Sequence, residues 1–228
     1  MAKVHLLGIN AMDPQGPERM RRALFSLNPD RIGIGATAKY LEHLRGEWIE
    51  RNLGTLSDCV SRGLSRDRAN YIENHIRNVF NYQFFIPLEY GEKTGTPVQL
   101  IGDDKEIELS RKRLDAMSLD PTEAEHHNFE HFRIESSASY EQHAKYVNGV
   151  IHLGNWVSDI EKEIIATQAK GIMATTSKHG DSMVYVCSLR DCLDAYIYQS
   201  QTIRSSIRPL QPEVSFLNQY EFRPQDVN

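Results

Sequence analysis

The sequence has few cysteines and no long apolar segment. Its three cysteines, Cys59, Cys187 and Cys192, are odd in number and follow no Cys-x-x-Cys spacing, so a disulfide framework is not expected. Chains of this kind are typical of a reducing compartment, and we expect a cytoplasmic protein. No apolar run approaches the roughly 20 residues of a membrane-spanning helix, and the first residues lack the apolar core of a secretory signal. No membrane partner is therefore expected.

The chain also has no surplus of positive charge. It carries 26 Lys and Arg against 31 Asp and Glu, a formal net charge of −5, so nucleic acid is not an expected partner. Two phosphate-binding signatures are missing as well. Gly33-x-Gly35 is followed by Ala-Thr-Ala, which lacks the last glycine of a dinucleotide fingerprint, and no Gly-Lys-Ser/Thr loop occurs.

Short apolar runs alternate with helical patterns along the chain. The runs at 4–9, 31–37, 98–102 and 183–188 have the length and composition of buried strands. A strand, a helix and a second strand in succession predict a parallel pair joined by a right-handed crossover. The expected fold class is therefore α/β, with a small, mostly parallel sheet of about four strands flanked by helices.

The domain boundaries follow from where this alternation stops. A single domain is expected over residues 1–203, with a helical insertion at about 118–160, where the pattern is least regular. Residues 204–228 contain three prolines and are expected to form an extended C-terminal arm. A long helical pattern at 67–95 should be broken or kinked at Pro87. Its apolar face and the arm are the expected surfaces for self-association, with packing inside the chain as the alternative.

Several polar residues follow the expected strands. In parallel sheets, ligands bind outside the carboxyl ends of the strands. The residues that could line such a crevice and bind a small molecule are Asn10, Asp13, Thr37, Asp103, Asp104, Arg111 and Arg190.

Short, degenerate motifs near the expected strands resemble those of a known family. The opening run Val4–Gly8, a helix, and then Asn28-Pro29-Asp30 before the second strand resemble the start of the TraB/PrgY family, which is related to the TIKI metalloproteases and to the ChaN-like proteins. Glu161–Ala166 resembles a later helix of that family, and Met183–Asp191 its last strand. The resemblance covers about residues 3–198. It implies an α/β fold with a catalytic metal site at the strand ends.

The chain departs from the family pattern where the metal ligands belong. Ala11 stands at the position of the first histidine, Gly35-Ala36 replaces a glutamate, and Leu189-Arg190-Asp191 replaces the final Gly-His. Divalent metals are bound by imidazole and carboxylate groups, which Ala, Gly and Arg do not have. The resemblance therefore implies a relative that has lost the metal site, a non-catalytic scaffold that acts by binding or self-association.

Two groups of residues support an alternative, a metal-dependent hydrolase or peptidase that uses Zn or Mn. Glu92, Asp103 and Asp104 are carboxylates near an expected strand end, and Glu92 and Asp103 are candidate catalytic groups. These three carboxylates could equally be solvated surface charges.

The second group spells His-x-x-Glu-His. On a helix His127 and His131 share one face and could bind a metal, while Glu130 would activate a water molecule. Spacing singles out no third ligand, and a surface His/Glu patch is the alternative interpretation.

Overall fold

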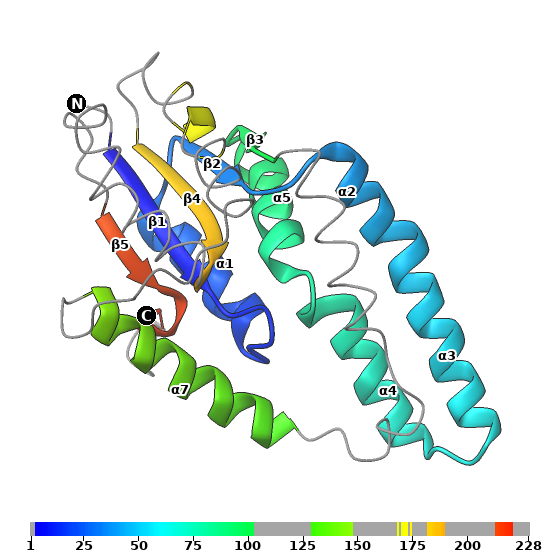
Figure 1. Ribbon diagram of the computed structural model, residues 1–228. Helices are drawn as coiled ribbons and strands as arrows, with labels where there is room; N and C mark the ends of the chain where they lie inside the picture. Colours follow the sequence, from blue (N-terminus) through cyan, green and yellow to red (C-terminus); the bar gives the residue numbers. More distant parts are fainter. Residues whose placement is uncertain are drawn as a thin grey trace.

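The computed structural model describes residues 3–102, 129–147, 182–189 and 213–220, together with the helical residues 168, 170–172 and 174. At its centre lies a sheet of five parallel strands in the order β3-β2-β4-β1-β5 (Figure 1). The strands are β1 Lys3–Ile9, β2 Arg31–Ile34, β3 Val98–Leu100, β4 Ser182–Ser188 and β5 Glu213–Phe216. The α/β class with a small parallel sheet is therefore confirmed, with five strands in place of about four.

The extra strand, β5, lies inside the range predicted as an extended arm. It pairs with β1 in parallel, from His5 opposite Glu213 to Gly8 opposite Phe216. Phe216 and Leu217 are buried in the core, so this part of the arm belongs to the sheet. Four residues directly after a proline-rich stretch are too short a run to show a strand period, which is why the pattern did not reveal β5.

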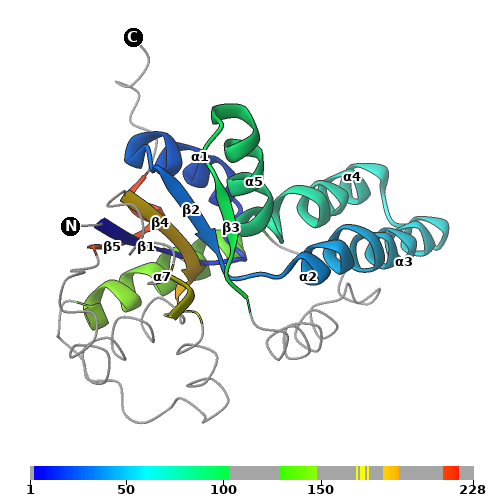
Figure 2. The same ribbon diagram turned by 90° about the horizontal axis from the view of Figure 1, so that it is seen from above.

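Helices cover both faces of the sheet. α1 (Gly16–Leu27) and α5 (Tyr82–Thr94) lie on one face, and α7 (Phe129–Val147) lies on the other (Figure 2). This division follows from right-handed crossovers, because the connections β1 to β2 and β2 to β3 run toward one edge while β3 to β4 runs back. The central strands β1 and β4 are covered on both sides, which explains their almost continuous apolar sequences.

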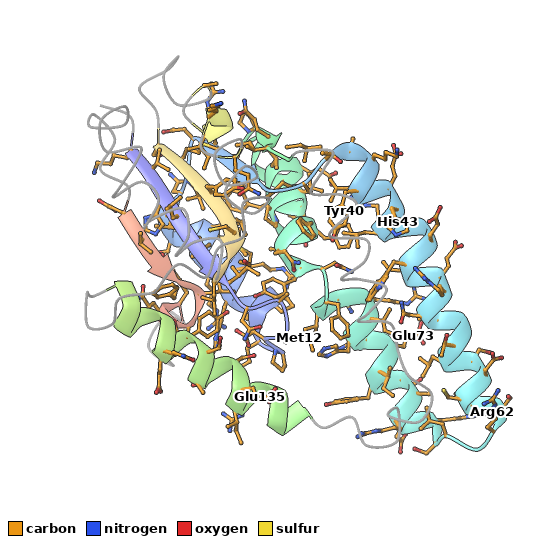
Figure 3. All side chains as sticks on the ribbon, in the orientation of Figure 1. Met12, Tyr40, His43, Arg62, Glu73 and Glu135 are labelled. Atoms are coloured by element: carbon orange, nitrogen blue, oxygen red, sulfur yellow. The ribbon has the colours of Figure 1, made fainter. Side chains whose placement is uncertain are left out.

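A helical hairpin projects beyond the sheet. Its first arm joins α2 (Ala38–His43), the π-helical turn η1 (Leu44–Trp48) and α3 (Ile49–Ser61), and its second arm joins α4 (Arg66–Asn74) and the π-helical turn η2 (His75–Val79). Figure 3 shows Tyr40 near the base of the hairpin and Arg62 at its tip. Glycine at position 54 predicts the end of a helix from the sequence, but the first arm continues through it. A glycine costs a helix only about 1 kcal/mol, and the buried Leu56 and Cys59 beyond it outweigh this.

The long helical pattern at 67–95 breaks six residues earlier than predicted. Pro87 lies inside α5, and the break falls at Asn81, between η2 and α5. The apolar face predicted for self-association is buried in the hairpin, since Ile72, Ile76 and Val79 are at most 3% exposed. Packing inside the chain therefore uses these residues. Within the described segments, no helix combines the length and the apolar character needed to cross a membrane.

Candidate functional site

The loop after β1 holds a buried carboxylate, Asp13. The side chain of Asp13 is 1% exposed. Its Oδ1 accepts a hydrogen bond from the Gln15 backbone N–H at 2.9 Å, and its Oδ2 accepts one from Nη1 of Arg19 at 2.8 Å. A buried carboxylate is costly unless it is paired and hydrogen-bonded, and Arg19 supplies the opposite charge from the first turn of α1.

Two tyrosines join this carboxylate from opposite faces of the sheet. Tyr82, at the start of α5, donates to the Asn10 carbonyl at 2.8 Å. Tyr140, on α7, accepts from the Asn10 N–H at 3.0 Å, and its hydroxyl lies 3.3 Å from Oδ2 of Asp13. We call Asn10, Asp13, Arg19, Tyr82 and Tyr140 the Asp13 network. Met12, labelled in Figure 3, marks the loop that contains Asn10 and Asp13.

The electrostatics keep both phenols protonated. Burial raises the pKa of Tyr82 well above its ordinary value, and the neighbouring Tyr140 and Asp13 add to this increase. Burial also raises the pKa of Tyr140, with Asp13 as the next cause. The network therefore joins hydroxyl donors to a neutralised carboxylate, and it fixes β1, α1, α5 and α7 to one another. Neither phenol of the network is therefore ready to lose its proton near neutral pH.

Glycine is required beside this network. A Cβ atom at Gly16 would lie 2.3 Å from Cζ of Tyr82, so the ring occupies the space that any side chain there would need. Because Gly16 has no side chain, the Tyr82 ring can cross the start of α1 and reach Asn10. The space beside the Gly16 Cα is therefore occupied by the Tyr82 ring.

Close contacts also surround the glycines after β2 and β3. A Cβ at Gly102 would lie 2.5 Å from the carbonyl carbon of Ala36, so the segments that follow β2 and β3 meet backbone to backbone. A Cβ at Gly35 would lie 2.9 Å from the Tyr185 hydroxyl, which comes from β4. Thr37, a predicted crevice residue, accepts the Tyr40 N–H as the cap of α2 at 3.3 Å.

The structure separates the other predicted carboxylate from these strand ends. Glu92 is exposed in the last turn of α5. Its neighbour Gly91 packs against Val98, the first residue of β3, so Glu92 lies toward the amino ends of the strands. Asn10 and Asp13 lie at the carboxyl ends. The structure therefore brings the predicted crevice residues Asn10 and Asp13 together and leaves Glu92, a candidate catalytic carboxylate, apart from them.

The remaining predicted site residues fall partly outside the described segments. Those that lie outside are Asp103, Asp104, Arg111, His127 and Arg190. Glu130 and His131 belong to the first turn of α7, and their side chains are not described. Among the residues that are described, no three His, Cys, Asp or Glu side chains gather as metal ligands would.

Sequence reasoning missed three members of the Asp13 network. Arg19 stands in the basic run Arg19–Arg22, which suggests a solvated helix face. Tyr82 and Tyr140 contact Asn10 across 72 and 130 residues of chain. A tyrosine directly after a helix break is a weak signal for the first contact, and no local signal exists for the second.

Comparison of the chain with models of protein families, with curated proteins and with solved structures gives no match. The resemblance to the TraB/PrgY family therefore stays a prediction.

Proposed function

We propose that this protein is a TraB/PrgY-like scaffold without the metal-dependent activity of that family, and that it acts by binding or self-association. The state of Asp13 carries the proposal. It is the one carboxylate among the described residues at the carboxyl end of β1, and both of its oxygens are bound by Gln15 and Arg19. A metal ion would have to displace the Arg19 guanidinium from a buried ion pair, which is strongly unfavourable.

The packing at the next strand ends supports the same conclusion. At Gly102 the backbone of Ala36 occupies the space that a side chain would need, and at Gly35 the Tyr185 hydroxyl would have to move to admit one. The packing around these two glycines therefore disfavours a ligand side chain at either position. This supports the proposed loss of the metal site.

A surface for self-association is supported on the α1–α5 face. Phe25 is 66% exposed, the largest exposed fraction among the large apolar side chains of the described residues, and its ring packs edge-on against Tyr90 at 5.2 Å. Beside it, Arg21 and Lys93 both bind Glu89, at 3.3 and 2.6 Å. An aromatic residue beside charges of both signs is self-complementary, as a two-fold interface between identical chains requires.

The test of the association surface is the mass of the protein in solution. We expect sedimentation equilibrium of the full chain to give a dimer that Phe25→Ser shifts to the monomer. The matched control is Val60→Ser, at an exposed position of the hairpin. A monomeric wild-type chain at all concentrations, or a dimer that survives Phe25→Ser, contradicts this surface.

The test of the metal-free proposal is direct metal analysis. After equilibrium dialysis of the full chain against Zn²⁺ or Mn²⁺, we expect less than one tightly held ion per chain, with no difference between wild type and the variants Glu92→Ala and His127→Ala. One ion per chain that either variant removes supports the hydrolase alternative and contradicts the proposal. No observation among the described residues favours that alternative.

A further inference from the structure

Strands β1 and β5 hold a serine, a histidine and a carboxylate in hydrogen-bonding sequence. The Ser215 Oγ lies 2.5 Å from Nε2 of His5, and the Nδ1 of the same ring lies 3.5 Å from Oε2 of Glu213. The two partners thus use opposite nitrogens of one imidazole. A nucleophile, a base and an orienting carboxylate in this order are the parts of an activated serine.

The parallel register of the two strands produces this arrangement. His5 on β1 is directly opposite Glu213 on β5, and Ser215 is two residues further along β5. Side chains two apart in a strand point to the same face, so the imidazole lies between the carboxylate and the hydroxyl. Because β5 is the outermost strand among the described residues, this group lies on the border of the described sheet.

The surroundings suit His5 to act as a base. Burial lowers its pKa below the ordinary value, although the carboxylate of Glu213 acts in the opposite direction. The ring is therefore neutral at neutral pH. A carboxylate beside Nδ1 favours the tautomer with the proton on Nδ1, which leaves the lone pair of Nε2 to accept the Ser215 hydroxyl proton.

Exposure and a second hydroxyl complete the group. Glu213 is 68% exposed at its side chain, the His5 side chain 16% and Ser215 7%, so the hydroxyl lies just below the surface. The Tyr220 hydroxyl lies 3.3 Å from Ser215 Oγ and can donate a hydrogen bond at the nucleophile. This degree of burial favours a small acyl group over a polymeric substrate.

We propose that Ser215 is a nucleophile that accepts an acyl group from small activated esters, with His5 as its general base and Glu213 as the positioning carboxylate. The Oγ attacks the ester carbonyl carbon and His5 takes the hydroxyl proton. The bond to the leaving alcohol breaks, and His5 returns the proton to the alcohol oxygen. A water molecule then attacks the acyl carbon while His5 takes its proton. The bond to Ser215 Oγ breaks, the acid is released, and His5 returns the proton to Oγ.

This chemistry goes beyond the proposed function. It needs no metal, and its groups lie at the β1–β5 edge rather than at the closed strand ends. Failure of either proposal leaves the other standing, because metal analysis does not involve Ser215.

The test is acylation of the full chain by p-nitrophenyl acetate, followed by release of p-nitrophenol and peptide mass spectrometry. We expect an acetyl group on Ser215. Its rate of formation should rise with pH, as His5 loses its proton, and then level off. His5→Gln should lower the rate by about 100-fold or more, the usual contribution of a positioned base. Glu213→Gln should lower it less and move the rise to lower pH, because the carboxylate opposes the lowered pKa of His5.

The matched control is His43→Gln, which removes another histidine paired with a glutamate, Glu47, from the hairpin (Figure 3). It should leave acylation of Ser215 unchanged. Circular dichroism checks the folding of each variant. If His5→Gln unfolds the chain, the exposed Glu213 variant and the wild-type pH profile decide. The proposal is overturned if folded wild type is not acylated, or if folded His5→Gln is acylated on Ser215 as fast as wild type. The three residues would then only hold β5 against β1.

Discussion

The two ends of β1 hold polar clusters of opposite character. At the carboxyl end, the Asp13 network is buried, its carboxylate is neutralised by Arg19, and burial holds both phenols in their protonated form. Toward the amino end, His5 is partly exposed, and its pKa lies below the ordinary value of 6.5. The first cluster fixes four elements to one another. The second contains a neutral imidazole that can accept a proton, as a general base must.

The Asp13–Arg19 pair should show the largest effect. Asp13→Ala removes the carboxylate that neutralises the Arg19 guanidinium, which is only 11% exposed, so we expect the free energy of unfolding to fall by about 3 to 5 kcal/mol. Urea unfolding measures this. Arg22→Ala breaks the more exposed pair with Glu18 on the same helix, and its effect should stay below about 1 kcal/mol. Equal effects of the two variants would contradict the structural role of the network.

Glycine substitutions separate filled from open space. Gly16→Ala forces the Tyr82 ring out of place and should lower the free energy of unfolding by about 1 to 3 kcal/mol. Gly54→Ala, in a helix with nothing within 4 Å of the new Cβ, should raise it by up to about 1 kcal/mol. Thermal unfolding of both variants measures the contrast. Stabilisation by Gly16→Ala would mean that the end of β1 is not closely packed.

Loss of the Tyr82 hydroxyl should have an effect of similar size to Gly16→Ala. Tyr82→Phe removes the donor to the Asn10 carbonyl, and a lost hydrogen bond to a buried partner costs about 1 to 3 kcal/mol. Tyr71→Phe is the control, since Tyr71 is half-buried on the hairpin. If urea unfolding gives the same free energy change for both variants, the hydrogen bond from Tyr82 to Asn10 does not stabilise the fold.

The smallest effect is the dependence of stability on pH through His5. Its pKa is lowered in the folded chain, so below about pH 6.5 the unfolded chain binds more protons than the folded chain. Stability should therefore be highest at neutral pH and decrease as the pH falls below 6.5, and His5→Gln should reduce this decrease. The measurement is the melting temperature between pH 5 and 8. A decrease that is identical in His5→Gln would assign it to other groups.

The fold could be predicted where burial dictates the sequence. The runs at β1, β2 and β4 are apolar because both faces of each strand are covered, and the expected parallel class follows from the helices between them. β5 has only four residues and pairs with the first strand across more than 200 residues, a contact that no local pattern contains. The end at Gly54 was predicted from propensity alone, and core packing overrode it.

The candidate site divides in the same way. Asn10 and Asp13 were found because strand ends gather polar groups, a rule that needs only local sequence. Their partners Tyr82 and Tyr140, and the pairing of His5 with Ser215, depend on which elements the fold brings together. Whether a polar residue is available or internally bound is likewise a property of packing, so the sequence marked Asp13 as a candidate without revealing Arg19 as its partner.

Titration of the ¹⁵N-labelled chain with Mn²⁺ tests most directly whether the strand ends are closed to metal. A bound paramagnetic ion broadens the amide signals around it. We predict that the signals of Asn10, Asp13 and Gly35 broaden no more than those of the hairpin tip around Arg62. Selective broadening of these three signals at one ion per chain, abolished by Asp13→Ala in a chain that remains folded, would contradict the closed site.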